Sequence, residues 1–474
     1  MAMHYDLGER KKRPGVYERH TNDGGSAVAG ARNGYAAIIC KADWGAENAV
    51  TEITDVNYIE KFYGLSNSDN TVGLIEELFN GGASTVYVSR LGKGGSKGSA
   101  TLKDSSGTSC VDLTTKYPGK RALNVAVKTN LSDDTIKEFY VYEGSAQLEK
   151  IKFDVSNGSE IDNLIEAGAA SAYFDFKKTA SYSGDGKLQT GETIAITVGT
   201  NPSNITNEDY SAAMAALEPY RPNAVCIDVD TQEVQLLLVR WADRMFDEGR
   251  KFHAVIGIPK SVEFDTRLSR AKSLNDKCAV CVVNGFKVGE TTYEGAKAAA
   301  RVCGMVAQVP SESTLTRAVI QGATDLTEVL NDSQYNKCIA SGALAFSKSQ
   351  DGLIWIDKAI TTFTVANDID DLGWSKIKRG KIRFELMTRV DQTVDNLVAK
   401  VRNNDDGRAT VTKAIKGVCE AMMKEEKIEP DYEVYLDPDN PPQGDEAWWV
   451  VSANDIDALE IVYLHYKFRF SPNV

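Results

Sequence analysis

Residues 224–258, AVCIDVDTQEVQLLLVRWADRMFDEGRKFHAVIGI, contain two apolar runs separated by one amphipathic stretch. The runs, 224–229 and 253–258, are short and rich in Val and Ile, and they predict buried β-strands. Between them, apolar residues recur at helical spacing over 234–246, which predicts a helix with one buried face. The alternation continues with a helix, a strand and a helix, at 262–274, 279–283 and 293–307. This order predicts an α/β fold with a largely parallel sheet covered by helices.

The same alternation occurs near the start of the chain. Apolar strands are expected at 35–40 and 85–88, helices at 55–63 and 71–79, and a further helix at 210–217. These segments resemble the later ones in length and apolar spacing. We therefore predict one α/β core formed by residues 21–95 and 202–360.

A change of composition separates the two pieces of this core. The segment 92–99, GKGGSKGS, has the composition of a flexible linker. Beyond it, short strands with polar turns are expected at 123–127, 138–142, 148–155, 173–176 and 193–198, with one helix at 160–167. The sequence thus predicts a mostly-β outer domain, residues 96–201, inserted into a loop of the core.

The last third predicts a C-terminal α+β domain over residues 361–458, preceded by a hairpin of strands 344–347 and 353–358. One helix has the apolar stripe Met387, Val390, Val394, Leu397 and Val401, and a second has Val411, Ile415, Val418 and Met422. The segment 403–407 should break the helix, with Asp405 or Asp406 as the N-cap of the second. Strands at 432–436 and 448–451 are expected before the end of the domain.

Both ends of the chain predict extended arms, residues 1–20 and 459–474. Near the C-terminus, apolar and polar residues alternate in the order Val462, Tyr463, Leu464, His465, Tyr466, Lys467, Phe468, Arg469 and Phe470. A period of two is typical of a half-buried β-strand, which can pair within its own fold or be lent to a neighbour. The N-terminal candidates are Arg13, Pro14, Gly15, Val16 and Tyr17. Two extended ends suggest a protein that polymerises.

Composition excludes several classes of protein. The chain has 474 residues, 42% of them hydrophobic and 26% charged, which is ordinary for a soluble protein. Its net charge of −13 argues against general nucleic-acid binding. Neither a membrane span nor a secretory signal is expected. The eight scattered cysteines predict buried, reduced thiols in a cytosolic setting.

Possible chemical sites fail on their spacing. The Gly-rich segment 92–99 has no phosphate-loop frame, and the pair Cys278 and Cys281 lacks further zinc ligands. The four histidines are far apart, and the carboxylate-rich segment 437–446 does not have calcium-loop spacing, so it is interpreted as a hairpin connection. We predict no catalytic, cofactor-binding or metal-binding residues, and no enzyme activity.

Two basic groups stand out in this acidic chain. One consists of Lys376, Lys378, Arg379, Lys381 and Arg383. The other, Lys413, Lys416, Lys424 and Lys427, should share the helical face opposite the apolar stripe. Each is interpreted either as a solvated surface or as a docking surface for an acidic partner.

Several segments together resemble the sheath protein of contractile phage tails and phage-tail-like particles. The N-terminal RPGVY at 13–17 is similar to the arm of that family, and CGMVA at 303–307, STLT at 313–316 and SGAL at 341–344 are similar to its central segment. NNDDGR at 403–408 and DALEIVYL at 457–464 are similar to its C-terminal domain. The insertion matches weakly, as a variable outer domain would.

The resemblance implies a structural subunit that polymerises as stacked hexameric rings around an inner tube. The arms would add strands to neighbouring subunits, and contraction would drive the tube through a target envelope. Expected partners are the chain itself, the inner tail tube protein, and baseplate and tail terminator proteins. Lys413, Lys416, Lys424 and Lys427 are the residues predicted to face the inner tube. The expected location is a virion tail or phage-tail-like particle, assembled in the bacterial cytoplasm. The alternatives left open are a hydrolase-like α/β enzyme and a surface-binding module.

Overall fold

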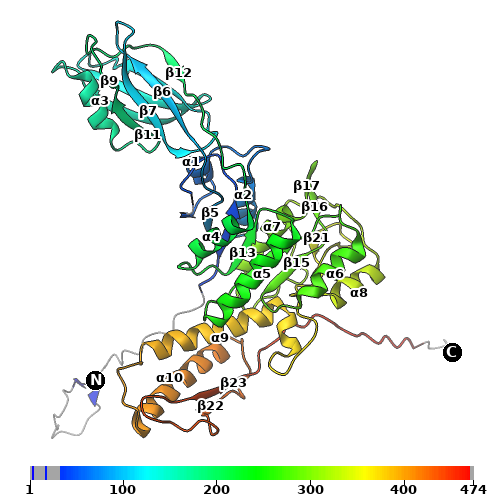
Figure 1. Cartoon of the computed structure of the whole chain (residues 1–474). Helices are drawn as coiled ribbons and strands as arrows, with labels where there is room; N and C mark the ends of the chain where they lie inside the picture. Colours follow the sequence, from blue (N-terminus) through cyan, green and yellow to red (C-terminus); the bar gives the residue numbers. More distant parts are fainter. Residues whose placement is uncertain (1–2, 5–16, 19–31, 48, 470–474) are drawn as a thin grey trace.

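The structure is a computed structural model that describes residues 3–4, 17–18, 32–47 and 49–469. Figure 1 shows three parts arranged along the molecule: an α/β core in the middle, a β-rich insertion at one end and a helical C-terminal part at the other. The core lies between the other two parts. Contacts of the core with each of them therefore decide how the molecule holds together.

The core is organised around one seven-stranded sheet with the order β19-β15-β14-β13-β3-β5-β4. Its strands are β3 Tyr35–Cys40, β4 Val50–Ile53, β5 Thr85–Arg90, β13 Ala224–Ile227, β14 His253–Gly257, β15 Ala279–Val282 and β19 Ala343–Leu344. All neighbouring pairs are parallel except β4 with β5. The predicted, largely parallel sheet is confirmed.

Helices cover both faces of this sheet (Figure 1). One face packs against α2 Gly73–Asn80 and α7 Ala296–Gln308, and the other against α4 Asn207–Leu217, α5 Gln232–Asp247 and α6 Phe264–Leu274. Adjacent strand residues serve opposite faces: Ile38 lies in the first apolar cluster and Ile39 in the second. Burial on both faces explains why these strands are continuously apolar in sequence.

The insertion consists of two antiparallel sheets, with the orders β10-β9-β8-β12 and β11-β7-β6. Its elements are β6 Lys97–Lys103, β7 Ser109–Pro118, β8 Asn124–Thr129, β9 Ile136–Glu143, β10 Ala146–Asp154, α3 Glu160–Gly168, β11 Phe174–Lys178 and β12 Thr193–Ala195. Its apolar core includes Phe139, Phe174 and Leu164 of α3. This cluster is separate from the two clusters of the α/β core.

The neck between the insertion and the core is not the flexible linker that the composition of residues 92–99 predicted. Strand β6 already begins at Lys97, and the two connections pair with each other through Ser96 and Thr200. Trp44, from the core side of the neck and next to the short helix α1 Tyr58–Tyr63, packs within the apolar core of the insertion. The glycines permit close approach here: a Cβ on Gly95 would lie 2.4 Å from the Thr200 carbonyl oxygen.

The region between α7 and the C-terminal part contains elements that the sequence did not predict. They are a small sheet of β16 Phe286–Val288, β17 Thr291–Tyr293 and β18 Asp325–Leu326, and the helix α8 Asp332–Ala340. Because β17 ends at Tyr293, helix α7 starts three residues later than expected. The predicted hairpin is confirmed as β20 Phe346–Lys348 paired with β21 Ile354–Ile356.

The C-terminal part begins with the short helix η1 Leu372–Ser375 and continues with α9 Ile377–Asp395 and α10 Asp405–Lys424. The position predicted for the first helix is wrong. Helix α9 starts ten residues before Met387, the first residue of the expected apolar stripe, and it ends before Leu397. The N-cap of α10 is Asn404, whose side chain accepts a hydrogen bond from the Gly407 N–H at 2.9 Å, and not Asp405 or Asp406. The hairpin β22 Glu433–Leu436 with β23 Trp449–Ser452 completes the fold.

Candidate inter-subunit surfaces

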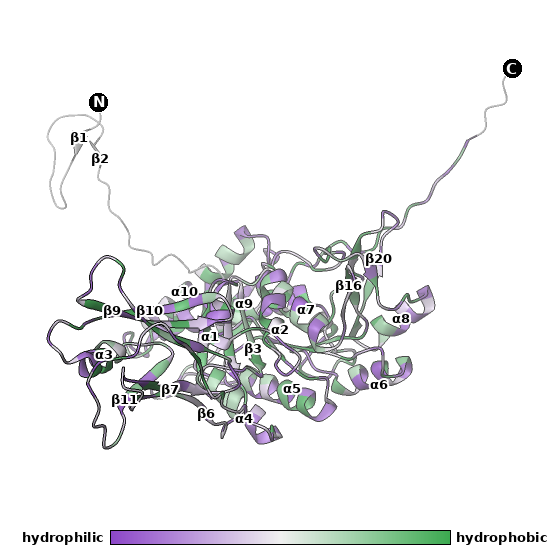
Figure 2. Ribbon diagram, turned by 90° about the horizontal axis from the view of Figure 1, so that it is seen from above, coloured by the Kyte–Doolittle hydropathy of each residue, from purple (hydrophilic) through white to green (hydrophobic). Residues whose placement is uncertain are grey.

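The C-terminal segment is extended and exposed, and it runs away from the body (Figures 1 and 2). No strand forms over residues 459–469 within the described chain, although the alternation predicts one. Both faces are open: Tyr463 is 91% exposed, Leu464 68% and Phe468 93%. Phe470 lies outside the described residues. A segment with strand-like alternation and no strand partner exposes apolar surface that a neighbouring sheet would cover.

The root of this segment, residues 455–460, is fixed to the body by charged contacts. Arg379 and Arg383 of α9 both bind the Asp455 carboxylate, and Lys376 lies 2.7 Å from Asp457 and 2.9 Å from Glu460. The Thr316 hydroxyl also donates to Glu460 at 2.7 Å. We call this group of contacts the root clasp. It leaves the chain without polar anchors to the body from Ile461 onward, within the described residues.

The predicted basic patch at 376–383 is therefore not an open docking surface. Three of its members bind the acidic root of the chain's own C-terminal segment. The other two are buried: Lys378 is 8% exposed, and Lys381 donates hydrogen bonds to the carbonyls of Val306 and Val309. Burial lowers the Lys381 pKa to about 7. The sequence showed the charges correctly but not that carboxylates from residues 455–460 would neutralise them.

Only part of the predicted N-terminal arm falls within the described residues. Two short strands, β1 Met3–His4 and β2 Tyr17–Glu18, pair in parallel. Arg13, Pro14, Gly15 and Val16 lie outside the described residues. The role of this arm stays a prediction.

Three of the four predicted tube-facing lysines lie on the exposed side of α10. Lys413 and Lys416 are exposed, and Lys424 is exposed but pairs with Glu420 at 2.8 Å. These three lie opposite the buried Val411, Ile415, Val418 and Met422. They form a small cationic surface in a protein that is otherwise acidic.

The fourth lysine does not belong to that surface. Helix α10 ends at Lys424, so Lys427 lies beyond the helix and not on its exposed face. Its side chain is buried, 2.9 Å from Glu385 of α9 and 2.7 Å from Glu425. Arg389 also binds both carboxylates. Lys427 therefore joins a buried charge cluster between α9 and the end of α10.

The β22–β23 hairpin offers two open strand edges. It is a two-stranded antiparallel sheet without a third strand among the described residues. Apolar side chains remain exposed on it, with Tyr435 at 43% and the adjoining Trp448 at 37%. The segment 437–446 connects its strands, as the sequence predicted. An isolated two-stranded sheet is only marginally stable, and further strands would stabilise it.

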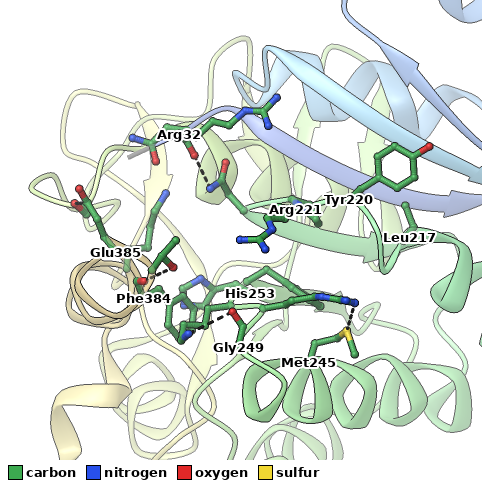
Figure 3. Close-up of a pocket in the computed structure, with 18 of the residues that line it drawn as sticks. Arg32, Leu217, Tyr220, Arg221, Met245, Gly249, His253, Phe384 and Glu385 are labelled. Carbon is green, nitrogen blue, oxygen red and sulfur yellow. Dashed lines mark hydrogen bonds between the residues drawn. The ribbon is translucent and has the colours of Figure 1, made fainter. Parts of the chain in front are cut away.

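A cavity of about 340 Å³ lies between the amino ends of β13 and β14 and helix α9 (Figure 3). Its floor is apolar and consists of Leu217, Trp241, Met245, Phe252 and Phe384. The lining also contains the cations Arg32, Arg221, Arg250 and Lys251 and the acids Glu218 and Glu385. Lys251 pairs with Asp391 at 3.1 Å, and Arg250 lies 4.0 Å from Glu218. Of these four cations, Arg32 and Arg221 are therefore the ones without a carboxylate partner among the described residues. Cavities of this size with an apolar lining and a few charged groups are typical of binding sites.

The cavity also contains buried polar atoms that lack partners within the described chain. His253 is fully buried, and neither of its ring nitrogens makes a hydrogen bond. Burial, followed by the charge of Lys381, lowers the pKa of His253 to about 3, so the imidazole is neutral at pH 7. The Nε of Arg389 is likewise unpartnered. The His253 ring packs against Phe384, with 4.9 Å between the ring centroids, so it forms part of the cavity wall.

The cysteines considered in the sequence analysis as possible zinc ligands belong to the interior of the protein. All eight cysteines are buried and unbridged, including Cys278 and Cys281 at the sheet. Among the residues that the structure describes, no cluster of three His, Cys, Asp or Glu side chains could hold a metal ion. In that same part of the chain, each helix is too short or too polar to cross a membrane.

Comparison with known proteins gives this geometry a context. Residues 203–362 match the family model described as the phage tail sheath protein central domain. The chain is 23% identical over 367 residues to the uncharacterized protein YqbK of Bacillus subtilis (strain 168), covering 75% of this chain and 74% of YqbK. It is 23% identical over 378 residues to the phage-like element PBSX protein XkdK of the same organism, covering 76% and 75%.

Solved structures share the fold. The sheath tail protein Lin1278 of Listeria innocua superposes with a TM-score of 0.69 at 20% identity, covering 90% of this chain and 96% of Lin1278. The sheath tail protein DSY3957 of Desulfitobacterium hafniense gives 0.70 at 18%, covering 93% and 100%. A chain of the contracted helical sheath of the anti-feeding prophage gives 0.54 at 10%, covering 97% and 99%. The resemblance to contractile tail sheath proteins is thus confirmed: residues 203–362 match the central-domain model of that family, and the chain shares its fold with solved sheath tail proteins.

Proposed function

We propose that this chain is the structural subunit of a contractile tail sheath. It would polymerise as stacked hexameric rings around an inner tube, and its contraction would drive the tube through a target cell envelope. The observation that carries the proposal is the C-terminal segment, which is clasped to the body at residues 455–460 and exposed on both faces beyond Ile461. A rooted, unpaired strand is suited to pair with another copy of the chain.

The acceptor that we propose is the β22–β23 hairpin of a neighbouring subunit. Its open edges supply N–H and C=O groups for main-chain bonds, and Tyr435 and Trp448 supply apolar contacts. Because donor and acceptor are different surfaces, the contact is heterologous and generates rings or helical polymers. The undescribed residues of the N-terminal arm are proposed to take part in the same connections.

Deletion and proline variants test strand donation. Removal of residues 461–474 should leave a folded subunit that forms no cylinders in electron micrographs. Leu464→Pro should act in the same way, because proline removes a ladder donor. Leu464→Val, which keeps the β-propensity, is the matched control and should assemble normally. Normal cylinders from the proline variant would contradict strand donation.

The inner tube is proposed to lie against α10. Lys413, Lys416 and Lys424 present the cationic surface, and an acidic tube surface is the expected partner. Exposed pairs contribute about 0–1 kcal/mol each, so the grip depends on repetition over many subunits and should weaken at high salt. Changing the three lysines to Glu should permit sheath self-assembly but prevent assembly on purified tubes. Tube-wrapped sheaths from that variant would place the tube elsewhere.

The expected neighbours at the sheath ends are a baseplate and a tail terminator. The anti-feeding prophage baseplate structure contains a chain that shares this fold, with a TM-score of 0.54 at 10% identity. We propose that the particle is a virion tail or a phage-tail-like particle assembled in the bacterial cytoplasm. Micrographs of particles from the source organism test this: particles labelled by an antibody to the chain should be contractile tails.

A further inference from the structure

One loop of the body displays apolar side chains to solvent although it is tightly held. In residues 364–372, Ile369 is 91% exposed, Val365 58% and Leu372 55%. Asp368, next to Ile369, is exposed as well. We call residues 364–372 the acidic loop. Three large apolar side chains within nine residues are thus open to solvent, as the centre of a contact surface requires.

The acidic loop is fixed by side chains from within and outside it. The Asn275 side chain accepts hydrogen bonds from the N–H groups of Thr364 and Val365, at 2.8 and 2.9 Å. The Asn367 side chain accepts from the N–H of Ile369 at 2.8 Å. Asp370 pairs with Lys277 at 2.9 Å. The exposure of Ile369 is therefore built into a pre-organised loop.

The cavity beside α9 has the complementary chemistry. Its floor is apolar, and its rim carries Arg32 and Arg221, both exposed. Figure 3 shows Arg221 and His253 bordering the same hollow. The C-terminal segment does not suit this rim. The residues that alternate with its apolar side chains include His465, Lys467 and Arg469, which bring no carboxylate. An occupant needs an apolar tip with a carboxylate beside it.

We propose that this cavity is a socket for the acidic loop of a second copy of the chain. Ile369 would fill the apolar floor, and Asp368 would pair with Arg221 on the rim. The inference rests on the proposed polymer and adds a body-to-body contact to the strand exchange of the arms. Loop and socket are different surfaces, so the contact is heterologous, as a ring or a helix requires.

Of the other segments that combine an exposed apolar residue with acids, two are considered as controls. Leu131, followed by Asp133 and Asp134, forms a hairpin tip of the insertion and is fully exposed. Val329 follows Glu328, whose carboxylate already pairs with Arg267. The acidic loop is favoured because Asp368 is adjacent to Ile369 and its carboxylate has no partner among the described residues, whereas Asp133 accepts hydrogen bonds from Thr135.

Charge reversal tests the pairing. Asp368→Lys and Arg221→Glu should each raise the protein concentration needed for cylinder formation by about tenfold, because each places like charges together. The double variant should recover assembly. Asp133→Lys combined with Arg221→Glu is the matched control and should not recover it. Recovery by the control, or none by the Asp368 pair, would overturn the proposal.

Cross-linking between copies tests the contact directly. The native cysteines are buried, so a short bis-maleimide should react with introduced cysteines alone. Mixed, differently tagged Ile369→Cys and Arg221→Cys chains should give a cross-linked pair, and Leu131→Cys with Arg221→Cys should not. Cylinders that form without this cross-link would overturn the socket while leaving the sheath function intact.

A failure of the socket proposal can also be distinguished from a failure of the proposed sheath function. If the wild-type chain forms no cylinders, the same cross-link is read in concentrated soluble protein, and its absence there overturns the socket as well. The last measurement is the change in unfolding temperature when citrate is added. Stabilisation that depends on Arg221, without any cross-link, would assign the cavity to a small anion and overturn the proposal.

Discussion

The insertion and the C-terminal part are attached to the same core by different chemistry. At the neck, Trp44 is 3% exposed and meets the Tyr117 ring edge-on at 5.5 Å. Arg90 is fully buried and donates to the neutral carbonyls of Ala42 and Pro118, at 3.2 and 2.9 Å. The neck is thus held by aromatic packing and by a cation surrounded by backbone oxygens.

At the C-terminal junction, by contrast, charges of opposite sign are buried together. Glu385, Arg389 and Lys427 are each less than 10% exposed and contact one another or Glu425. A buried pair contributes little net stability, but removing one partner leaves an uncompensated charge. The neck contains a buried ion pair of its own, Arg121 with Glu143 at 2.8 Å, whereas the junction contains several, so the junction should respond more strongly than the neck to salt and pH. In the proposed sheath, the junction is the part that bears the arm and the tube-facing helix.

Trp44→Ala should have the largest effect. Truncating a buried tryptophan costs about 3–5 kcal/mol of the free energy of unfolding, and here the cavity opens inside the insertion. Denaturant titration with amide exchange on the insertion measures the loss. Trp448→Ala, at a residue that is 37% exposed, is the control and should cost about 1 kcal/mol or less. Similar losses for both variants would show that the neck is not an apolar anchor.

Lys427→Met should be nearly as severe. Removing one partner of a buried ion pair costs about 3–5 kcal/mol, and we expect the lower end because Glu385 keeps Arg389 and Ser311 as partners. Lys424→Met removes an exposed i,i+4 pair and should cost about 0.5 kcal/mol or less. Equal unfolding free energies of the two variants would return Lys427 to the exposed face predicted from the sequence.

The difference between these two lysines shows where sequence reasoning succeeds. The spacing of Val411, Ile415, Val418 and Met422 predicted the buried face of α10 and hence Lys413 and Lys416 opposite it. The prediction failed at Lys427 because the helix ends at Lys424, and helix ends are not set by apolar periodicity. Glu385, its partner, lies 42 residues away in the chain. A pair so distant leaves no local signal.

The secondary structure also divides into elements that the sequence predicts and elements that it does not. The strand at 224–229 was predicted from a continuous apolar run, and β13 is there because sheet burial on both faces demands such a run. Two-residue strands such as β18 have no periodicity to detect. Helix α8 could have been found from its N-terminus: Asn331 and Gln334 form a capping box. The start of α9 was hidden because its basic residues were interpreted as a surface patch.

Acid should weaken the junction in a defined window. The hydrogen bond from Arg389 lowers the pKa of Glu425 from its ordinary 4.5 to about 2. Because the folded-state pKa is lowered, the stabilisation is full above about pH 4.5 and is lost as the pH falls toward 2. Amide exchange at the end of α9, followed from pH 5 to 2.5, should show this loss, and Glu425→Gln should remove most of the dependence.

Exchange must be measured at the end of α9 itself, because a carboxylate in the insertion is also protonated in this pH range. A hydrogen bond from Lys150, together with one from Tyr140, lowers the pKa of Glu138 to about 2. A global unfolding curve would combine both losses. If exchange at the end of α9 is unchanged across this range while that in the insertion rises, the junction is not the pH-sensitive attachment.

Arg379→Met should have the smallest effect and the most local one. Asp455 keeps Arg383 as a partner at 3.0 Å, so we expect a local loss of about 1 kcal/mol, which corresponds to roughly fivefold faster amide exchange. The reporter is the Ile456 N–H, which donates to the Lys427 carbonyl at 3.0 Å and so measures the root clasp itself. Lys120→Met, which removes the exposed pair with Asp69 at the neck, is the control and should leave that amide unchanged. Because the clasp fixes the point from which the exposed segment departs, faster exchange at Ile456 should be accompanied by more irregular cylinders. Unchanged exchange would mean that the root is held by its backbone bonds alone, and that the charges at 376–383 serve only to neutralise the acids that they meet.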